Sequence, residues 1–423
     1  MRITVTPAWQ TAYKTIEQGH NLLILGSAGT GKSTFLKWLK QNLADQKKMA
    51  VVAPTGMAAL QAGGQTIHSF FGFKPQLMQG TPDDWRKPRT PKFFQNLELL
   101  VIDEISMVRA DILTTIDQFL QKYGPLPGNP FGGVQIVALG DLFQLPPVVR
   151  RDEMDLFDAL YPTPFFFGSQ SWHNFRVLEF PDIFRQQDAT FIELLNSIRQ
   201  GERRPDVLAT LNERVTPEPP ATAVKLAARN QTVHNMNQAE LTALSAKPTT
   251  YEASTTGKID ENALLTPARL TLKPQARVMF TRNDPQGRWV NGTAGVVQAC
   301  GDKRIDVQLN SGKLVVVEPI KWEWTKYELD SATESPKAST TGTFTQFPLT
   351  LAWAMTIHKA QGQTLDAAYL DLSDGGIFTE GQLYVALSRV RRFQDLTLRQ
   401  PITPADVRIS PTLVQFYEGL RAA

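Results

Sequence analysis

Cysteine and histidine are scarce in this sequence, which has one Cys and five His among 423 residues. A single cysteine cannot form a disulfide within the chain, and so few Cys and His residues cannot build a zinc cluster. An excess of charge of one sign is also lacking, because 44 Lys and Arg face 41 Asp and Glu, for a formal net charge of +3. This balance excludes a uniformly basic protein that coats nucleic acid, but it is compatible with a local basic channel.

Long apolar runs are missing as well. The sequence has no run of about 18 apolar residues, the length needed to cross a bilayer, and residues 1–10 lack the apolar core of a signal peptide. We therefore expect a soluble intracellular protein with no membrane partner. At roughly 150 residues per domain, the length predicts two or three domains.

The first part of the chain alternates short apolar segments with longer amphipathic ones, which predicts an α/β fold with a parallel sheet. The strands are expected at 21–25, 49–53, 97–102 and 134–139, and an amphipathic helix at 109–123. Prolines and cations interrupt this pattern between Gly72 and Lys92. They predict an irregular protrusion, either a solvated loop or a nucleic-acid contact.

A second α/β block begins near residue 181, with helices expected at 190–200 and 231–244. Residues 272–345 differ, because short β-rich runs alternate there with Gly, Asn and Asp turns, as in a small barrel. The α/β pattern returns at 349–353. The barrel is therefore predicted to be inserted into the second block.

The segment GSAGTGKS at 26–33 fits the pattern GxxxxGK[ST] and lies between an expected strand and an expected helix. Its glycines let backbone N–H groups turn inward around phosphates, and the helix N-terminus adds partial positive charge. We expect Lys32 on the β- and γ-phosphates of ATP and the Ser33 hydroxyl on Mg²⁺. A glycine-rich turn without a ligand is the alternative. The nucleotide-binding residues are expected to be Gly26, Ser27, Ala28, Gly29, Thr30, Gly31, Lys32, Ser33 and Thr34.

Two further apolar strands end in polar residues. Asp103 and Glu104 follow the strand at 97–102, where a parallel sheet delivers side chains to its carboxyl edge. Asp103 would hold Mg²⁺, and Glu104 would act as the general base or position the attacking water. Gln144 follows the strand at 134–139 and precedes two prolines, which suits a group that senses the γ-phosphate. A solvent-exposed loop glutamine is the alternative.

With these motifs in place, nearly the whole chain resembles the PIF-type (petite integration frequency) DNA helicases of the 5′-to-3′ branch of superfamily 1, with RecD-like helicases as relatives. The matching segments are GSAGTGKST at 26–34, APTGMAA at 53–59, QTIHSFFGF at 65–73, IDEISM at 102–107, GDLFQLPPV at 140–148, FRQ at 184–186, AMTIHKAQGQTLD at 354–366 and LYVALSRVR at 383–391.

The resemblance implies two RecA-like P-loop domains that enclose ATP between them. Domain 1A would cover 1–180 with a wedge at about 72–92, domain 2A would cover 181–271 and 346–423, and an SH3-like domain 2B would cover 272–345. The second RecA-like domain would supply Arg185 and Arg389 to the ATP site. The catalytic set implied is Lys32, Asp103, Glu104, Gln144, Arg185 and Arg389.

The resemblance also places Gly362 near the γ-phosphate and Gln10 on the adenine edge. It implies a DNA groove across both motor domains, lined by Pro54, Thr55, Gly56, His68, Phe70, Thr356, His358 and Lys359. Taken alone, these histidines are more typical of structural positions, and one of Phe70 and Phe71 is expected in the core. Three tryptophans of the predicted barrel, Trp289, Trp322 and Trp324, could stack on bases, but at least two of them are expected in the barrel core.

The implied partners are single-stranded DNA and junctions between single strands and duplexes. Whether G-quadruplexes or RNA–DNA hybrids are also substrates stays open, and we expect a monomer in solution, near the nucleoid if the source is bacterial. Two other functions are compatible with the motifs. One is a RecD-like translocase subunit that needs partners to separate strands, and the other is a nucleotide-gated DNA-binding module.

Overall fold

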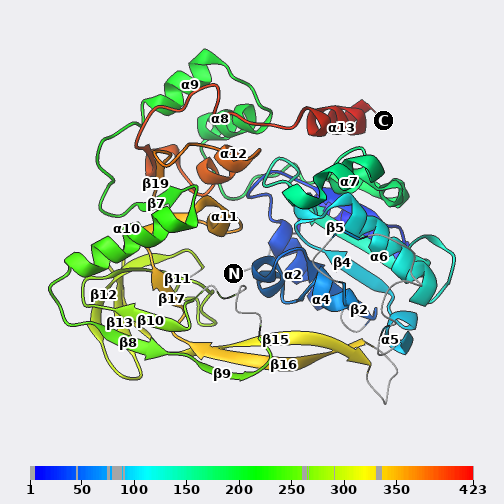
Figure 1. Ribbon diagram of the computed structural model, residues 1–423, viewed down its shortest axis with the longest axis horizontal. Coiled ribbons are helices and arrows are strands. Elements are labelled where there is room, and N and C mark those ends of the chain that lie inside the picture. The colour runs from blue at the N-terminus through cyan, green and yellow to red at the C-terminus, as the bar shows by residue number, and fades with distance from the viewer. Residues whose placement is uncertain are drawn as a thin grey trace.

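The computed structural model describes residues 5–43, 46–73, 77–78, 88, 91–259, 264, 266–289, 291–329 and 336–422 (Figure 1). The fold is mixed α/β and contains two parallel sheets and a β-rich part. Most of the residues of the predicted wedge at 72–92 lie outside the described residues. Within the described part of the chain, no helix is both long and apolar enough to cross a membrane.

The N-terminal half forms a six-stranded parallel sheet in the order β3-β2-β4-β5-β1-β6, which we call, with its helices, the first α/β body. Its strands are β1 (Leu22–Leu25), β2 (Met49–Ala53), β3 (Gln65–Thr66), β4 (Leu99–Ile102), β5 (Gln135–Gly140) and β6 (Arg176–Glu179). Its helices are α1 (Pro7–Glu17), α2 (Lys32–Leu43), α3 (Gly56–Ala62), α4 (Ile67–Phe71), α5 (Pro91–Gln95), α6 (Ala110–Tyr123) and α7 (Met154–Leu160).

Both faces of this sheet are covered, which explains why its central strands are continuous apolar runs. Leu22 and Ile24 of β1 pack with α1 and α2 on one face. Leu23 and Leu25 pack on the other face, in the cluster that includes α6. The alternation follows from the two-residue period of a strand.

The second α/β body is a four-stranded parallel sheet in the order β18-β7-β19-β20 with its helices. Its strands are β7 (Val224–Ala227), β18 (Ala354–Thr356), β19 (Ala368–Asp371) and β20 (Leu396–Leu398). Its helices are α8 (Ala189–Arg199), α9 (Pro205–Asn212), α10 (Asn230–Ala243), α11 (Ile357–Ala360) and α12 (Gln382–Leu387).

The last helix, α13 (Pro411–Ala422), returns to the first α/β body and lies near α7 in Figure 1. The Phe416 ring stacks on Phe167 with 3.9 Å between centroids, and Tyr417 packs edge-on against Phe143. The Tyr417 hydroxyl also donates a hydrogen bond to Glu179 at the end of β6. The C-terminal helix therefore joins the two bodies.

The β-rich part contains three antiparallel sheets, with strand orders β14-β13-β12-β11-β17, β10-β8 and β15-β16-β9. Its strands are β8 (Thr249–Glu252), β9 (Ser254–Gly257), β10 (Arg269–Leu272), β11 (Arg277–Phe280), β12 (Ala294–Cys300), β13 (Ile305–Leu309), β14 (Leu314–Val317), β15 (Ile320–Leu329), β16 (Pro336–Gln346) and β17 (Leu349–Leu351).

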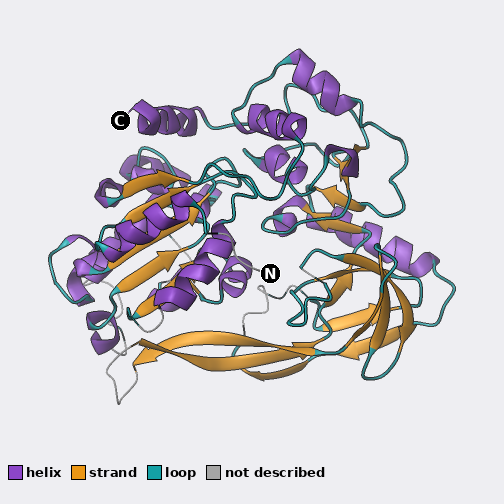
Figure 2. Ribbon diagram, turned by 180° about the vertical axis from the view of Figure 1, so that it is seen from behind, coloured by secondary structure: helices purple, strands orange, loops and turns teal. Residues whose placement is uncertain are grey.

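This part is wider than the 272–345 segment expected from the sequence. β9 pairs with β16 and β17 pairs with β11, although both strands lie outside that segment. The reason is burial, because Tyr251, Leu270 and Leu349 share one apolar core with the β11–β14 strands. The paired strands β15 and β16 extend along one side of the molecule in both views, and β15 contacts β3 and α5 of the first body (Figures 1 and 2).

Candidate nucleotide site and nucleic-acid interface

The loop between β1 and α2 has the geometry that the phosphate-binding motif predicts. Gly29 and Gly31 adopt left-handed φ values of +87° and +82°, which favour glycine. The Lys32 ammonium lies over the loop, where Nζ donates to the carbonyl oxygens of Gly26 at 2.8 Å and Ser27 at 2.9 Å. Burial lowers the pKa of Lys32, and the carboxylates of Asp141 and Glu104 oppose that shift.

Asp103 and Glu104 lie at the carboxyl end of β4, as expected. Glu104 is held in the left-handed region at φ 53° and ψ 49°, which is uncommon for a residue other than glycine and marks local strain. Burial, together with the charge of Glu104, raises the pKa of Asp103 to about 7. Burial also raises the pKa of Glu104, although Lys32 opposes the shift. The Asp103 carboxyl group is therefore poised to exchange protons near neutral pH.

Gln144 is buried at the carboxyl end of β5, so the solvent-exposed alternative is excluded. Its amide nitrogen Nε2 donates to Asp141 Oδ2 at 3.1 Å. The other oxygen of Asp141 lies 3.4 Å from Nε of Arg199, a buried residue of α8. Gln144 is thus linked through Asp141 to the second α/β body.

Arg389 is 1% exposed and follows helix α12. Its Nε donates to the Val385 carbonyl at 2.7 Å, one of its terminal nitrogens donates to the Ser388 hydroxyl at 2.6 Å, and the other approaches the carbonyls of Ala360 and Gln363 at 3.3 Å. All these acceptors are neutral. Burial and the nearby Arg185 lower the pKa of Arg389 to about 9, and Glu104 and Asp141 act in the opposite direction.

Arg185 lies in the same charge cluster. Its guanidinium is partly buried and donates to the Ser388 carbonyl at 3.1 Å. The backbone around it packs on the phosphate loop, because Phe184 N donates to Gly29 O at 2.8 Å and a Cβ at Gly29 would lie 2.5 Å from Arg185 Cβ. The structure therefore brings Arg185 next to the loop that carries Lys32, and it brings Arg389 into the same charge cluster as Arg185 and Glu104.

Phe184 is a residue of this site that the sequence reasoning did not single out. Its ring is 50% exposed and lies against Gly31, close to Trp9 of α1. Gln10 is exposed on the same helix. No local pattern distinguishes Phe184 from an ordinary apolar residue, because its exposure depends on how the loop at 184–186 packs.

Gly362 has a left-handed φ of +75°, and a Cβ there would lie 2.8 Å from Gln61 Oε1 of α3. The close approach that requires glycine is thus to the first body. Its neighbour Gln361 donates to Glu104 Oε2 at 3.4 Å. The roles predicted for Gln10 and Gly362 toward adenine and γ-phosphate stay predictions.

Two cavities border the first turn of α3, and several of the predicted DNA-binding residues line them. The first, of about 540 Å³, is lined by residues of all three parts, including Met57, Arg269, Thr356 and Lys359. We call it the Lys359 cavity. The second, of about 300 Å³, lies between the first body and the β-rich part. We call it the Trp324 cavity, and its lining includes Gly56, Thr66, Ser69, Lys258 and Trp324.

The other predicted DNA contacts fall in different environments. Pro54 and Thr55 precede α3, and the Thr55 hydroxyl caps that helix by accepting from Ala58 N. His68 is half-buried in α4. His358 is exposed and its ring stacks at 17° on Phe378, which is 49% exposed and which the sequence reasoning did not select.

The prediction that Phe70 faces DNA is not supported by the structure. Phe70 is 8% exposed and Phe71 is 5% exposed, so both phenylalanines are in the core, rather than one as expected. They pack against an aromatic cluster that includes Phe93 and Phe94. The burial of α4 against α5 and α6 accounts for this difference.

Of the barrel tryptophans, Trp289 and Trp322 are buried, at 6% and 7% exposed. Trp289 belongs to the apolar core of the β11–β14 strands, as expected, whereas Trp322 packs against Phe344 in the sheet of β15 and β16 instead. Trp324 is partly exposed and lines the cavity named after it.

Comparison with known proteins identifies the family. A model of the PIF1-like helicases matches residues 6–207. The chain is 32% identical to the ATP-dependent DNA helicase Pif1 of Bdellovibrio bacteriovorus, across 99% of this chain and 93% of that protein. This chain belongs to the PIF1-like helicase family. It is also 34% identical to human ATP-dependent DNA helicase PIF1, across 96% of this chain and 62% of the human protein.

Solved structures of PIF1-like helicases have the same fold. Bacteroides sp. Pif1 in complex with ADP-AlF4 matches with a TM-score of 0.90 and 34% identity, covering 100% of this chain and 98% of that one. Bacteroides Pif1 bound to ssDNA matches with a TM-score of 0.70 and 35% identity, again covering 100% of this chain and 98% of that one. The arrangement seen in this chain is therefore closer to that of the ADP-AlF4 complex than to that of the ssDNA-bound structure.

Proposed function

We propose that this chain is an ATP-dependent DNA helicase that moves 5′ to 3′ along single-stranded DNA. The observation that carries the proposal is the position of Arg389. It comes from the second α/β body, is fully buried, and shares one charge cluster with Lys32 and Glu104 of the first. Closure of the two bodies on a nucleotide would place this cation against the transferred phosphoryl group.

Within the pocket, the phosphate loop and Lys32 would bind the β- and γ-phosphates, since the lysine already lies over the loop carbonyls. Ser33 and Asp103 would hold Mg²⁺, because hydroxyl and carboxylate oxygens are ligands that this ion prefers. Mg²⁺ would neutralise charge on the phosphate oxygens. Glu104 would accept the proton of the attacking water, a role that its raised pKa favours.

The second α/β body would respond to the γ-phosphate. Arg185 and Arg389 would exchange some of their neutral backbone acceptors for phosphate oxygens, which bind guanidinium groups more strongly. Gln144 would report the same phosphate through Asp141. Hydrolysis would remove these contacts and let the bodies reopen.

The adenine base would lie between the exposed Phe184 ring and α1. Aromatic rings stack on any base, and a side-chain amide such as that of Gln10 can pair with the adenine edge. The half-exposed position of Phe184 beside Gly31 supports this placement.

Single-stranded DNA would follow the Lys359 and Trp324 cavities. Hydroxyl, backbone and ammonium groups of Thr55, Gly56, Thr356 and Lys359 suit phosphate contacts. The partly exposed Trp324 suits base stacking. A DNA substrate implies an intracellular location, which in a bacterium is the nucleoid.

The first α/β body would be motor domain 1A and the second would be motor domain 2A. The β-rich part would be the SH3-like domain 2B, with limits near 249 and 351 because β8, β9 and β17 pair within it. We propose a monomer that acts on single strands and on junctions with duplexes.

The experiment that tests the proposal compares unwinding of duplexes that carry either a 5′ or a 3′ single-stranded tail, using the purified chain alone with ATP and Mg²⁺. We expect unwinding of the 5′-tailed duplex only, and ATP hydrolysis that oligo(dT) stimulates. Stimulated hydrolysis without unwinding would favour a translocase that needs partners. DNA binding without hydrolysis would favour a nucleotide-gated binding module.

A further inference from the structure

Tyr384 joins three segments that are far apart in the chain. It belongs to α12, is 3% exposed, and lies where the second α/β body meets the first. Its hydroxyl oxygen accepts a hydrogen bond from Ala28 N in the phosphate loop at 2.8 Å. The same hydroxyl donates to Asp141 Oδ2, after β5, at 3.0 Å.

The hydroxyl can make both bonds only while it keeps its proton. Burial and the charge of Asp141 raise the pKa of Tyr384, so the phenol stays neutral at physiological pH. These two hydrogen bonds form a relay from Ala28 through Tyr384 to Asp141, and its direction is therefore fixed. The loop amide donates to the phenol, and the phenol donates to the carboxylate.

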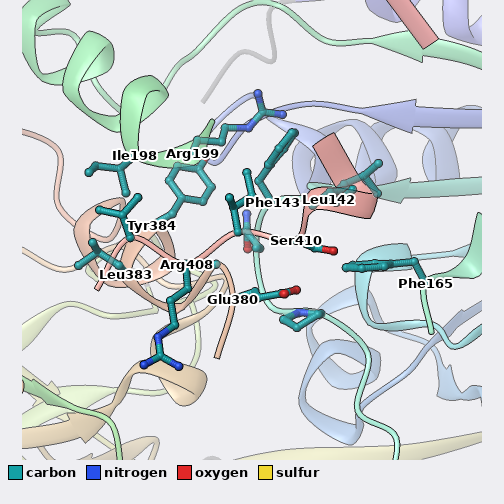
Figure 3. A pocket seen from close by; sticks show the side chains of 16 residues that line it. Leu142, Phe143, Phe165, Ile198, Arg199, Glu380, Leu383, Tyr384, Arg408 and Ser410 are labelled. Atoms are coloured by element: carbon teal, nitrogen blue, oxygen red, sulfur yellow. The ribbon is translucent and has the colours of Figure 1, made fainter. Parts of the chain in front are cut away.

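Asp141 is in turn shared with groups on both bodies. One of its oxygens receives Gln144 Nε2 at 3.1 Å as well as the tyrosine hydroxyl, and the other lies 3.4 Å from Arg199 Nε. The guanidinium of Arg199 lies 4.3 Å from the centre of the Phe143 ring and is held there by packing. Figure 3 shows Arg199, Phe143 and Tyr384 lining the same pocket.

We propose that Tyr384 is a positioning residue that couples the phosphate loop to the second α/β body. The inference rests on the proposed function. Helix α12 ends at Leu387 and leads directly to Ser388 and Arg389. A displacement of Ala28 or Asp141 when nucleotide binds is therefore passed through Tyr384 to the segment that carries the buried arginine.

A purely structural hydroxyl would affect stability but would leave the response to DNA unchanged, and this difference defines the test. We would measure ATP hydrolysis with and without oligo(dT) for the full chain and for Tyr384→Phe, which keeps the ring and removes only the hydroxyl. We expect kcat with oligo(dT) to fall about tenfold while the KM for ATP changes less than twofold, because the contact acts in closure rather than in ATP binding.

The matched control is Tyr369→Phe. Tyr369 is a buried tyrosine of β19 whose hydroxyl donates to the carbonyls of Thr216 and Pro217, which are not part of the nucleotide site. We expect this variant to lose a similar amount of thermal stability and to keep its DNA-stimulated rate. Equal rate losses in the two variants would overturn the inference.

A second variant tests the relay from the other end. Asp141→Asn should lower the stimulated rate, and the double variant with Tyr384→Phe should be no slower than the slower single variant, because both changes break one relay. If Tyr384→Phe does not fold, Asp141→Asn still provides the contradicting outcome, because it weakens the acceptor of the tyrosine hydroxyl. A wild-type stimulated rate in either folded variant would overturn the inference and leave the helicase proposal standing, whereas a wild-type chain without DNA-stimulated hydrolysis would overturn both.

Discussion

The amide of Gln361 in the second α/β body donates to the Glu104 carboxylate in the first, with 3.4 Å between Nε2 and Oε2. Glu104 is the proposed base, and Gln361 follows the short helix α11, whose N-cap Thr356 and residue Lys359 line the Lys359 cavity. A single hydrogen bond thus connects the hydrolytic carboxylate with the segment proposed to hold DNA. This connection gives a direct route by which bound DNA can change the rate of hydrolysis.

Removing the catalytic groups should separate hydrolysis from DNA binding. We expect Lys32→Ala and Glu104→Gln to lower DNA-stimulated ATP turnover at least about 100-fold. Affinity for oligo(dT), measured by fluorescence anisotropy, should stay within about twofold of the wild type, since neither side chain lines a DNA cavity. The control is Lys37→Ala, because Lys37 is an exposed lysine on α2, the helix that begins at Lys32. Normal unwinding by either variant would contradict the site assignment.

The close packing at Gly381 should not tolerate a side chain. A Cβ there would lie 2.3 Å from Gln144 O and 2.5 Å from Phe143 O, and φ is +68°. We expect Gly381→Ala to lower both the melting temperature and the DNA-stimulated rate, because the two bodies must move apart. Gly312→Ala is the control, since its φ is +84° but no atom lies within 4 Å of the added Cβ. It should show only the strain of the left-handed backbone, about 1 kcal/mol.

Trp324 should contribute to DNA affinity through stacking. We expect Trp324→Leu to weaken binding of oligo(dT) about tenfold, within the range of roughly 1–3 kcal/mol for one stacked base. The check is a series of oligonucleotides that each lack one base. At one position the loss of the base should weaken the wild type but not the variant. Equal losses at all positions in both proteins would refute the stacking role.

The environment of His68 predicts a dependence of stability on pH. Burial, together with the charge of Arg109, lowers the pKa of His68 below its usual 6.5. The unfolded chain therefore takes up a proton below pH 6.5 that the folded chain does not, and the free energy of unfolding falls as pH falls. We expect His68→Gln to reduce this slope in urea titrations between about pH 6.5 and 5. An unchanged slope would exclude the histidine as its source.

Much of the α/β framework could be predicted from local pattern. β2 coincides with the expected strand at 49–53, and α8 and α10 lie within one residue of the expected helices at each end. The phosphate loop was recognisable because its strand, glycines and helix are consecutive. These features depend on interactions between residues close in sequence, which a local pattern can report.

Other features depend on contacts that no local pattern contains. The long strands β15 and β16 were not expected as elements, because β15 alternates charged residues with tryptophans over a surface that is only partly covered. Ala28 and Tyr384 are 356 positions apart, so their hydrogen bond follows from how the bodies pack. Phe70 lies in a motif that resembles a DNA contact, and only the packing of α4 shows that its ring is buried.

The return of α13 to the first body has a mechanical consequence. Its rings and the Tyr417 hydroxyl hold the last residues of the chain against Phe167 and Glu179, while the segment leading to it leaves from β20 of the other body. The two bodies are connected by the segment at 180–188, between β6 and α8, and again by the C-terminal helix. Because they are tethered at both places, they cannot slide freely past each other. Their relative motion is expected to be a rotation about the line through these two tethers, and shortening the chain before residue 411 would release one end of that axis.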